Sequence, residues 1–287
     1  MGDNILTMIK VIELPIDKDM GGLTSYVLQL YRMIDKEEFE LTLLSYDDPQ
    51  NFDVNYNVET VSRPYHTIQF YKKMKCLLSE GKDIIHFHQS YVNIIPILIA
   101  KLAGFKTIIL HAHSSSIDDN RKIVRFLKTG LHKVGRFLLP YLVDTYVGCS
   151  TKASEWMFPR KCIDSDSYYL LHNAIDLDLY DRNINLGLEV RQKFNIPKDA
   201  LVVGHIGRFT PVKNHPFIID IFKEVLKQNP NSYLFLLGDG VERHKIESLV
   251  KSAAISDKVI FMGYVNNTVD IMQAIDIMIL PSLFEGL

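Results

Sequence analysis

The sequence predicts an α/β protein with two Rossmann-like domains, each built on a parallel sheet. The first observation is a repeated alternation of short apolar segments with longer segments whose apolar residues recur at helical spacing. The second is that this alternation is interrupted and restarts at Leu201. The third is the length of 287 residues, which suits about two domains. We therefore expect an N-terminal domain over 1–173, a linker over 174–198 and a C-terminal domain over 199–287, with a cleft between the domains.

The elements of the first block can be placed from their periodicity. The expected strands are Leu6–Leu14, Phe39–Tyr46, Val58–Ser62, Asp83–His88, Lys106–Leu110, Asp144–Cys149 and Ser167–Leu171. The expected helices are Leu23–Ile34, Ile68–Leu78, Val92–Gly104, Asn120–Val143 and Thr151–Phe158. Gly104 is a typical helix stop, and Ser150 or Thr151 is a typical N-cap.

The second block repeats the pattern. A helix is expected at Leu186–Phe194 before it. The expected strands are Leu201–Ile206, Tyr233–Leu237, Lys258–Met262 and Asp276–Leu280, and the expected helices are His215–Gln228, Val241–Ala254 and Val269–Ala274.

The composition is that of an ordinary globular protein, with 47% hydrophobic and 23% charged residues. The net charge of −2 gives no general attraction to nucleic acid. The three cysteines fit neither a disulfide framework nor a zinc site. No signal peptide is visible, and the longest apolar stretch, around Val92–Phe105, is too polar to span a bilayer. We therefore expect a cytoplasmic protein.

One stretch, Gly204–His215 (GHIGRFTPVKNH), follows a predicted strand and precedes a predicted helix. It holds two cations, Arg208 and Lys213, together with two glycines. Such a turn at the carboxyl end of a parallel strand is where α/β folds bind phosphate, since the glycines let the backbone approach and the cations neutralise charge. The alternative is a surface loop with two solvated cations.

A second turn of this kind opens the first predicted helix at Gly21 and Gly22. These glycines either face a ligand or only permit a tight turn.

Two successive predicted strands each end in a His-x-His pattern, with His86 and His88 on one and His111 and His113 on the other. At a period of two, the paired histidines share one face of the sheet. The pattern favours an active-site wall over purely structural histidines. A metal site is conceivable, but no carboxylate or cysteine stands beside the histidines in the sequence.

The predicted helix at Asn120–Val143 is basic and amphipathic, without an acidic residue between Asp119 and Asp144. Such a helix either contacts an anionic membrane surface or covers the core with its apolar face. Its cations are Arg121, Lys122, Arg125, Lys128, Lys133 and Arg136.

Several motifs together resemble the retaining glycosyltransferases of the GT-B fold, in particular family 4, also called glycosyltransferase group 1. The motifs are Gly204–His215 (GxxGRF and KNH), Leu236–Arg243 (LLGDGVER), Val259–Val265 (VIFMGYV) and Leu280–Leu287 (LPSLFEGL), with Gly21–Leu23 and His172–Asp176 (HNAID) as weaker matches in the first block. Ala174 replaces the glycine of the family's interdomain segment. The resemblance covers nearly the whole chain.

The resemblance implies a role for each matching residue. Arg208 and Lys213 would hold the donor diphosphate as leaving group, Glu285 would contact the donor, and His113 would face the sugar and the acceptor. The donor-binding positions are Gly21, Gly22, Gly207, Gly240, Val265, Ser282, Gly286 and Leu287. The second glutamate of the family's Glu-x7-Glu element would follow Leu287, so we expect a second domain truncated at its C-terminus.

The implied reaction is sugar transfer from a UDP- or GDP-sugar to a saccharide or lipid-linked acceptor, in exopolysaccharide or capsule synthesis, on or near the inner membrane face. No cofactor and no metal are expected, because Arg208 and Lys213 would replace a metal and no Asp-x-Asp motif is present. The alternatives are a non-catalytic partner subunit and a sugar-nucleotide epimerase, the latter needing more carboxylates. A nicotinamide dehydrogenase is disfavoured because Gly238–Gly240 is not a GxGxxG motif.

Overall fold

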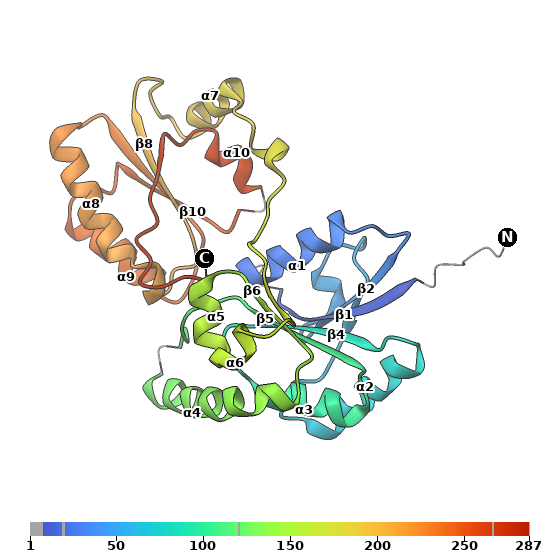
Figure 1. Ribbon diagram of the computed structural model, residues 1–287. Helices are drawn as coiled ribbons and strands as arrows, with labels where there is room; N and C mark the ends of the chain where they lie inside the picture. Colours follow the sequence, from blue (N-terminus) through green and yellow to red (C-terminus); the bar gives the residue numbers. More distant parts are fainter. Residues whose placement is uncertain (1–7, 19–20, 120, 266, 287) are drawn as a thin grey trace. The chain divides into compact units, whose positions relative to one another are not determined.

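A computed structural model describes residues 8–18, 21–119, 121–265 and 267–286. The chain divides into two compact units (Figure 1). Unit 1 comprises Met1–Ala174 together with Phe284–Leu287, and unit 2 comprises Ile175–Leu283. The predicted linker, 174–198, begins at the division and lies almost wholly within unit 2.

Unit 1 is built on a seven-stranded parallel sheet with the strand order β3-β2-β1-β4-β5-β6-β7. Its strands are β1 (Ile9–Ile16), β2 (Phe39–Ser45), β3 (Val58–Thr60), β4 (Ile84–Gln89), β5 (Thr107–Ala112), β6 (Thr145–Gly148) and β7 (Tyr168–Leu170). Every predicted strand is present, and the predicted start of the first, Leu6, lies outside the described residues. Because all seven strands are parallel, their carboxyl ends lie at one edge of the sheet.

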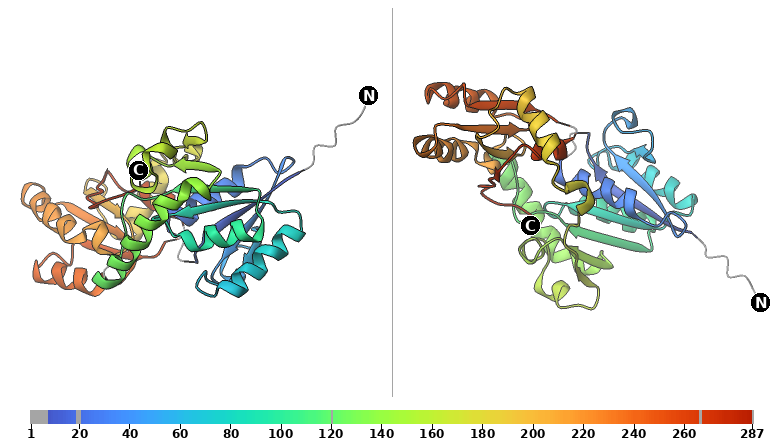
Figure 2. Two further views of the ribbon diagram at one scale, coloured as in Figure 1. Left: turned by 60° about the horizontal axis from the view of Figure 1, so that its bottom comes forward. Right: turned by 90° about the horizontal axis from the view of Figure 1, so that it is seen from above.

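Helices cover both faces of this sheet, as Figure 1 and the turned views of Figure 2 show. Helix α1 (Gly22–Met33) packs on one face, with Val27 and Leu28 against Ile16 and Leu43. The larger core lies on the other face, under α2 (Thr67–Ser79), α3 (Ile94–Ala103), α4 (Lys122–Leu138) and α5 (Thr151–Met157). The remaining helical segments are α6 (Arg160–Ile163), η1 (Pro49–Asn51) and η2 (Leu139–Tyr141).

Two predicted helix ends are confirmed. Gly104 follows α3 with a φ of 108°, the left-handed conformation that favours glycine. Ser150 caps α5 by accepting a hydrogen bond from the amide of Ala153.

Unit 2 repeats the architecture with a four-stranded parallel sheet in the order β10-β9-β8-β11. Its strands are β8 (Leu201–Ile206), β9 (Ser232–Leu237), β10 (Val259–Gly263) and β11 (Ile277–Met278). Helices α8 (His215–Gln228) and α9 (Arg243–Ser252) pack on one face of the sheet, and α7 (Ile184–Lys193) and α10 (Thr268–Met272) on the other. The 3-10 segments are η3 (Leu177–Tyr180) and η4 (Pro211–Lys213).

Helix α7, which falls in the predicted linker, is an integral part of unit 2. The buried guanidinium of Arg191 donates to the carbonyls of Ala274 and Ala200 and pairs with Asp276 at 2.7 Å. Gly187 packs directly against the backbone of Gln273, so any side chain there would collide with it.

Helix α4 turns part of its apolar side outward. Ile123 and Phe126 are each 77% exposed and Phe137 is 72% exposed, whereas His132 and Gly135 are buried. The hypothesis that the apolar face covers the core is therefore wrong for these side chains. The described residues include no helix long and apolar enough to cross a membrane.

Candidate functional site

In unit 2, the loop after β8 carries the two predicted cations at the carboxyl edge of the sheet. Phe209 is fully buried and anchors the loop, while the neighbouring Arg208 is exposed and Lys213 is half-buried. A Cβ atom added at Gly207 would lie 2.9 Å from the His205 ring and 3.2 Å from the Lys213 stem. Glycine at this position therefore lets the loop fold tightly beside the Lys213 side chain.

Two further glycines, Gly238 and Gly240, follow β9 with φ values of 128° and 154°. A Cβ atom at Gly238 would collide with the carbonyl oxygen of Gly207, and one at Gly240 would lie 2.7 Å from that of Phe209. The loops after β8 and β9 therefore pack backbone against backbone, and only glycine allows this approach.

Hydrogen bonds join the loops at this edge into one surface. The amide of Phe209 donates to the carbonyl of Asp239, and the amide of Leu283 donates to that of Val212. Ser282 lies in the segment after β11 with its hydroxyl shielded from solvent and without a hydrogen-bond partner among the described residues. Val265 follows β10 and is half-buried against the α10 side of the unit 2 core.

The same edge of unit 2 holds a neutral histidine at the start of α8. His215 is fully buried against Phe209, with ring centroids 4.2 Å apart. Burial, with smaller contributions from His205 and Lys213, lowers its pKa to about 4. Neither ring nitrogen has a hydrogen-bond partner among the described residues, so His215 packs as an uncharged ring beneath the loop.

In unit 1, the four predicted histidines lie together on the face of the sheet that α1 covers. A buried carboxylate joins them from β1. Glu13 Oε2 lies 2.5 Å from His88 Nε2 and 3.1 Å from His86 Nδ1, and His88 Nδ1 lies 2.8 Å from His113 Nε2. The expectation that no carboxylate accompanies the histidines is therefore wrong, because strand pairing brings in a residue that lies 73 positions before His86.

Three histidines of this cluster, His88, His111 and His113, are held in the neutral form. Burial lowers the pKa of His113 to about 3 and holds the pKa values of His88 and His111 still further below their usual range. Neighbouring imidazoles act in the same direction, since a positive charge on one ring disfavours a charge on the next.

Ring nitrogens of His86, His88 and His111 lie within 4.8 Å of one another, close enough for one metal ion to reach all three. Both nitrogens of His88, however, already have partners in Glu13 and His113. A metal ion bound through His88 would have to break one of these hydrogen bonds, so the cluster fits a hydrogen-bonded network better than a metal centre.

Helix α1 places Tyr26 and the predicted diglycine at this edge of unit 1. The Tyr26 ring lies 5.2 Å from His113 and 5.3 Å from His111, and burial raises its pKa to about 12. Gly21 has an extended backbone conformation, with φ −65° and ψ 170°, and a Cβ atom added at Gly22 would meet no atom within 4 Å. Neither backbone strain nor packing among the described residues explains why Gly22 is a glycine.

The predicted donor residues Glu285 and Gly286 lie in the segment grouped with unit 1. Ser115 Oγ donates to the carbonyl of Glu285 at 2.5 Å, and Ser150 Oγ donates to that of Gly286. Hydroxyl donors after β5 and β6 can therefore bind oxygen atoms beside His113, whose carbonyl Gly286 approaches closely. Leu287 lies outside the described residues.

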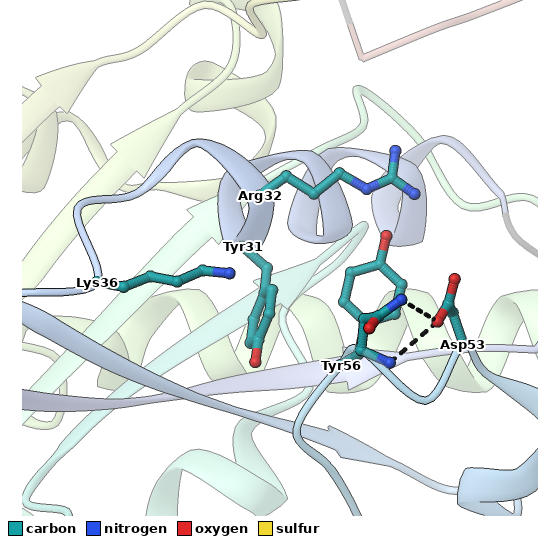
Figure 3. Close-up of a pocket in the computed structure, with 6 residues that line it drawn as sticks. Tyr31, Arg32, Lys36, Asp53 and Tyr56 are labelled. Carbon is teal, nitrogen blue, oxygen red and sulfur yellow. Dashed lines mark hydrogen bonds between the residues drawn. The ribbon is translucent and has the colours of Figure 1, made fainter.

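A separate pocket lies between the end of α1 and the loop before β3 (Figure 3). Its polar groups largely satisfy one another: Lys36 lies over the Tyr31 ring, Arg32 lies over the Tyr56 ring, and Asp53 accepts from the Asn55 amides. None of the predicted site residues lines it.

Sequence reasoning missed Glu13 and Tyr26. A signal for Glu13 was present, since a glutamate between Ile12 and Leu14 in an apolar strand is rarely buried without a partner. Tyr26 carried no such signal, because an aromatic residue on the apolar side of a helix usually belongs to the core.

Comparison with known proteins covers most of the chain. The family model described as Glycosyltransferase Family 4 matches residues 20–179, and that of Glycosyl transferases group 1 matches residues 188–287. EpsF of Bacillus subtilis, a glycosyltransferase candidate, is 25% identical over 97% of this chain and 74% of its own length. The Escherichia coli UDP-Gal:alpha-D-GlcNAc-diphosphoundecaprenol alpha-1,3-galactosyltransferase is 22% identical over 97% of this chain and 75% of its own length.

Among solved structures, Anabaena HepE in complex with UDP and glucose matches with a TM-score of 0.73 at 16% identity. The match covers 96% of this chain and 74% of that one. The predicted GT-B fold class, with Rossmann-like parallel-sheet domains, is confirmed.

Proposed function

We propose that this protein moves a hexosyl residue from a UDP- or GDP-sugar to a saccharide or lipid-linked acceptor. The chain belongs to glycosyltransferase family 4 and is a transferase of the hexosyl type. The reaction retains the anomeric configuration and uses no metal ion, and its product is part of a cell-surface polysaccharide. The relative that acts on a diphosphoundecaprenol-linked sugar and the UDP complex of HepE support the choice of donor and acceptor classes.

The loop Gly207–Lys213 is the observation that carries this proposal. Departure of the nucleoside diphosphate places growing negative charge on a phosphate, and preorganised cations stabilise that charge most strongly as it develops. Arg208 and Lys213 lie on a loop that is fixed by Phe209 and by the glycines after β9. In the proposed mechanism these cations bind the diphosphate, which is the leaving group.

Donor residues at the other strand ends fit the same assignment. Gly240 would leave room for the phosphates, Val265 would contact the base, and the shielded Ser282 hydroxyl is available to a donor oxygen. In unit 1, Gly22 and His113 would contact the sugar. Glu285, Gly286 and Leu287 keep their proposed donor role, which remains to be tested by substitution.

The test is to replace Arg208 and Lys213 singly by alanine in the full-length protein. We expect sugar transfer to fall about 100- to 1,000-fold in each variant, because one charge-stabilising donor is lost. The exposed Lys251→Ala variant on α9 is the matched control and should keep full activity. Full activity of both loop variants would contradict the assignment.

The two rival functions are separated by donor-only experiments. Thermal shift against a panel of UDP- and GDP-sugars should show stabilisation of about 2.7 kcal/mol at a hundredfold excess over the dissociation constant. A non-catalytic partner subunit would show little or none, and an epimerase would convert the donor to an epimer without any acceptor.

We also propose that α4 binds an anionic membrane surface. Its exposed apolar side chains form a stripe at helical spacing: Ile123, Phe126, Leu127, Val134 and Phe137. Lys122, Arg125 and Lys133 are exposed and have no ion-pair partner among the described residues, whereas Arg121 and Lys128 pair with Asp119. Exposed apolar side chains beside cations without an ion-pair partner among the described residues are typical of a helix that lies at a membrane surface.

Vesicle sedimentation tests this surface. Combined Lys122→Glu and Lys133→Glu substitutions should weaken binding to vesicles of phosphatidylglycerol and phosphatidylcholine by about thirtyfold or more, at about 1 kcal/mol for each lost cation. Lys72→Glu with Lys251→Glu applies the same charge change elsewhere and should leave binding nearly unchanged. Equal binding by the α4 variant would contradict the proposal.

A further inference from the structure

We propose that Glu13 and His88 are positioning residues that fix the tautomer of His113, so that its Nδ1 is an unprotonated acceptor for a hydroxyl group of the sugar substrate. This inference rests on the proposed function, in which His113 contacts the sugar. It adds two residues and a defined proton arrangement to that site.

Strand register places the three residues in a line across the sheet. Glu13 on β1 pairs with His86 on β4, and His88 lies two residues further along the same face. His88 in turn pairs with His111 on β5, and His113 again lies two residues further. The hydrogen bonds therefore run diagonally across the sheet toward its carboxyl edge. Glu13 is bonded to His88 at 2.5 Å, and His88 is bonded to His113 at 2.8 Å.

The direction of these hydrogen bonds follows from the carboxylate. Ring nitrogens of both His86 and His88 face the Glu13 carboxylate: His88 Nε2 lies 2.5 Å from Oε2, and His86 Nδ1 lies 3.1 Å from Oε2 and 3.3 Å from Oε1. In the proposed arrangement Glu13 is ionised, and a carboxylate is an acceptor only, so it accepts from both rings. His88 Nε2 therefore carries a proton and donates it to Glu13.

The remaining proton positions are then determined. A neutral imidazole has one N–H, and burial keeps the pKa of His88 well below its usual range. His88 Nδ1 is thus an acceptor, and His113 Nε2 must donate to it. Burial lowers the pKa of His113 to about 3, so this ring is also neutral and its Nδ1 is left with a lone pair.

His113 Nδ1 has no hydrogen-bond partner within the described part of the chain, although the groups around the ring are close. Tyr26 approaches from α1 and His111 from β5. A neutral acceptor suits a hydroxyl group and disfavours a phosphate oxygen. This assigns His113 to the sugar and leaves the diphosphate to the cations of unit 2.

The tautomer is measured directly in the wild-type protein. Selective ¹⁵N-histidine labelling and long-range ¹H–¹⁵N correlation distinguish the two ring nitrogens, and His113→Asn and His88→Asn variants assign the signals. We expect both rings to be neutral with the proton on Nε2 at pH 7. A proton on Nδ1 of His113, or a charged ring, would overturn the inference. This result does not depend on activity, so failure to find any sugar transfer would overturn the proposed function alone.

A double-mutant cycle tests whether Glu13 acts through His113. Glu13→Gln should lower kcat/KM by about 10- to 100-fold, since one ordered hydrogen bond to substrate is lost. In a His113→Ala background, the same substitution should have little further effect. Additive losses would mean that Glu13 acts on the fold instead, and would overturn the positioning role. If Glu13→Gln does not fold, His88→Gln completes the cycle.

Discussion

The carboxyl edges of the two parallel sheets share an architecture but carry different side chains, neutral imidazoles in unit 1 and cations in unit 2. In unit 1 the edge holds the neutral imidazoles of His88 and His113, which are hydrogen-bonded to each other, and His88 is also bonded to Glu13. In unit 2 it holds an exposed cation, Arg208, and a half-buried one, Lys213, on the loop that begins at Gly207. The first edge leaves ring nitrogens of His86 and His111 without a hydrogen-bond partner among the described residues, and the second offers charge to a ligand. The fold thus fixes where a site can form, and the side chains decide whether it suits a hydroxyl group or a phosphate.

Low pH should produce the largest difference in stability between the two units. Burial lowers the pKa of four histidines in unit 1, namely His88, His111, His113 and His132. In unit 2, by comparison, it lowers the pKa of His215. As pH falls below about 6.5, the unfolded chain binds protons that the folded chain refuses, so the free energy of unfolding decreases. Each such histidine contributes about 1.4 kcal/mol per pH unit until its folded pKa is reached. Unit 1 should therefore unfold first.

The chain offers a built-in probe for this prediction. Trp156 is the single tryptophan, lies in unit 1 and stacks on His132 at 4.1 Å. Its fluorescence should change at a higher pH than the one at which the α8 amides of unit 2 lose protection from hydrogen exchange. A His132→Phe variant controls for quenching by the adjacent ring. Simultaneous loss in both units, or earlier loss in unit 2, would contradict the expected order.

Glycine substitutions should give the next largest difference in stability between the two units. Gly238→Ala forces a Cβ atom against the carbonyl of Gly207 at a φ of 128°, and backbone strain of this kind costs about 1–3 kcal/mol before the collision is counted. Gly22→Ala meets open space at a helix start and should change stability by less than about 1 kcal/mol. Urea unfolding measures both.

The same pair also tests what each glycine is for. If Gly22 lies against a substrate, Gly22→Ala should reduce sugar transfer while its unfolding midpoint stays near that of the wild type. A Gly238→Ala protein as stable as the wild type would show that the loops after β8 and β9 do not require their close approach.

Local patterns predicted most of the fold, because each element is set by its own residues. Strand β8 and helix α8 begin and end where the apolar periodicity places them, and the caps at Gly104 and Ser150 are confirmed. The predicted strand Asp276–Leu280 is reduced to Ile277–Met278, which pairs with β8 on one side only.

What the sequence did not reveal depends on contacts between distant strands. Glu13 meets His88 across 75 positions, and only the pairing of β1 with β4 shows that the histidines have a carboxylate partner. The orientation of α4 was open for a similar reason. Its amphipathic pattern fits either a helix on an anionic membrane surface or one whose apolar face covers the core. Packing of His132 on Trp156 and of Gly135 on Val92 shows which side faces inward.

Salt should have the smallest of these effects, but it tests whether the cations of unit 2 bind the phosphates while the histidines of unit 1 stay uncharged. Raising NaCl from about 50 to 500 mM shortens the screening length to a few ångströms and should weaken UDP or GDP binding about three- to tenfold, because Arg208 is exposed. Lys213→Gln should flatten this dependence, since one of the two screened charges is gone. The proton positions of His88 and His113, whose rings are uncharged, should stay the same over this range. Nucleotide affinity that is insensitive to salt would mean that the cations of unit 2 are not the phosphate contacts.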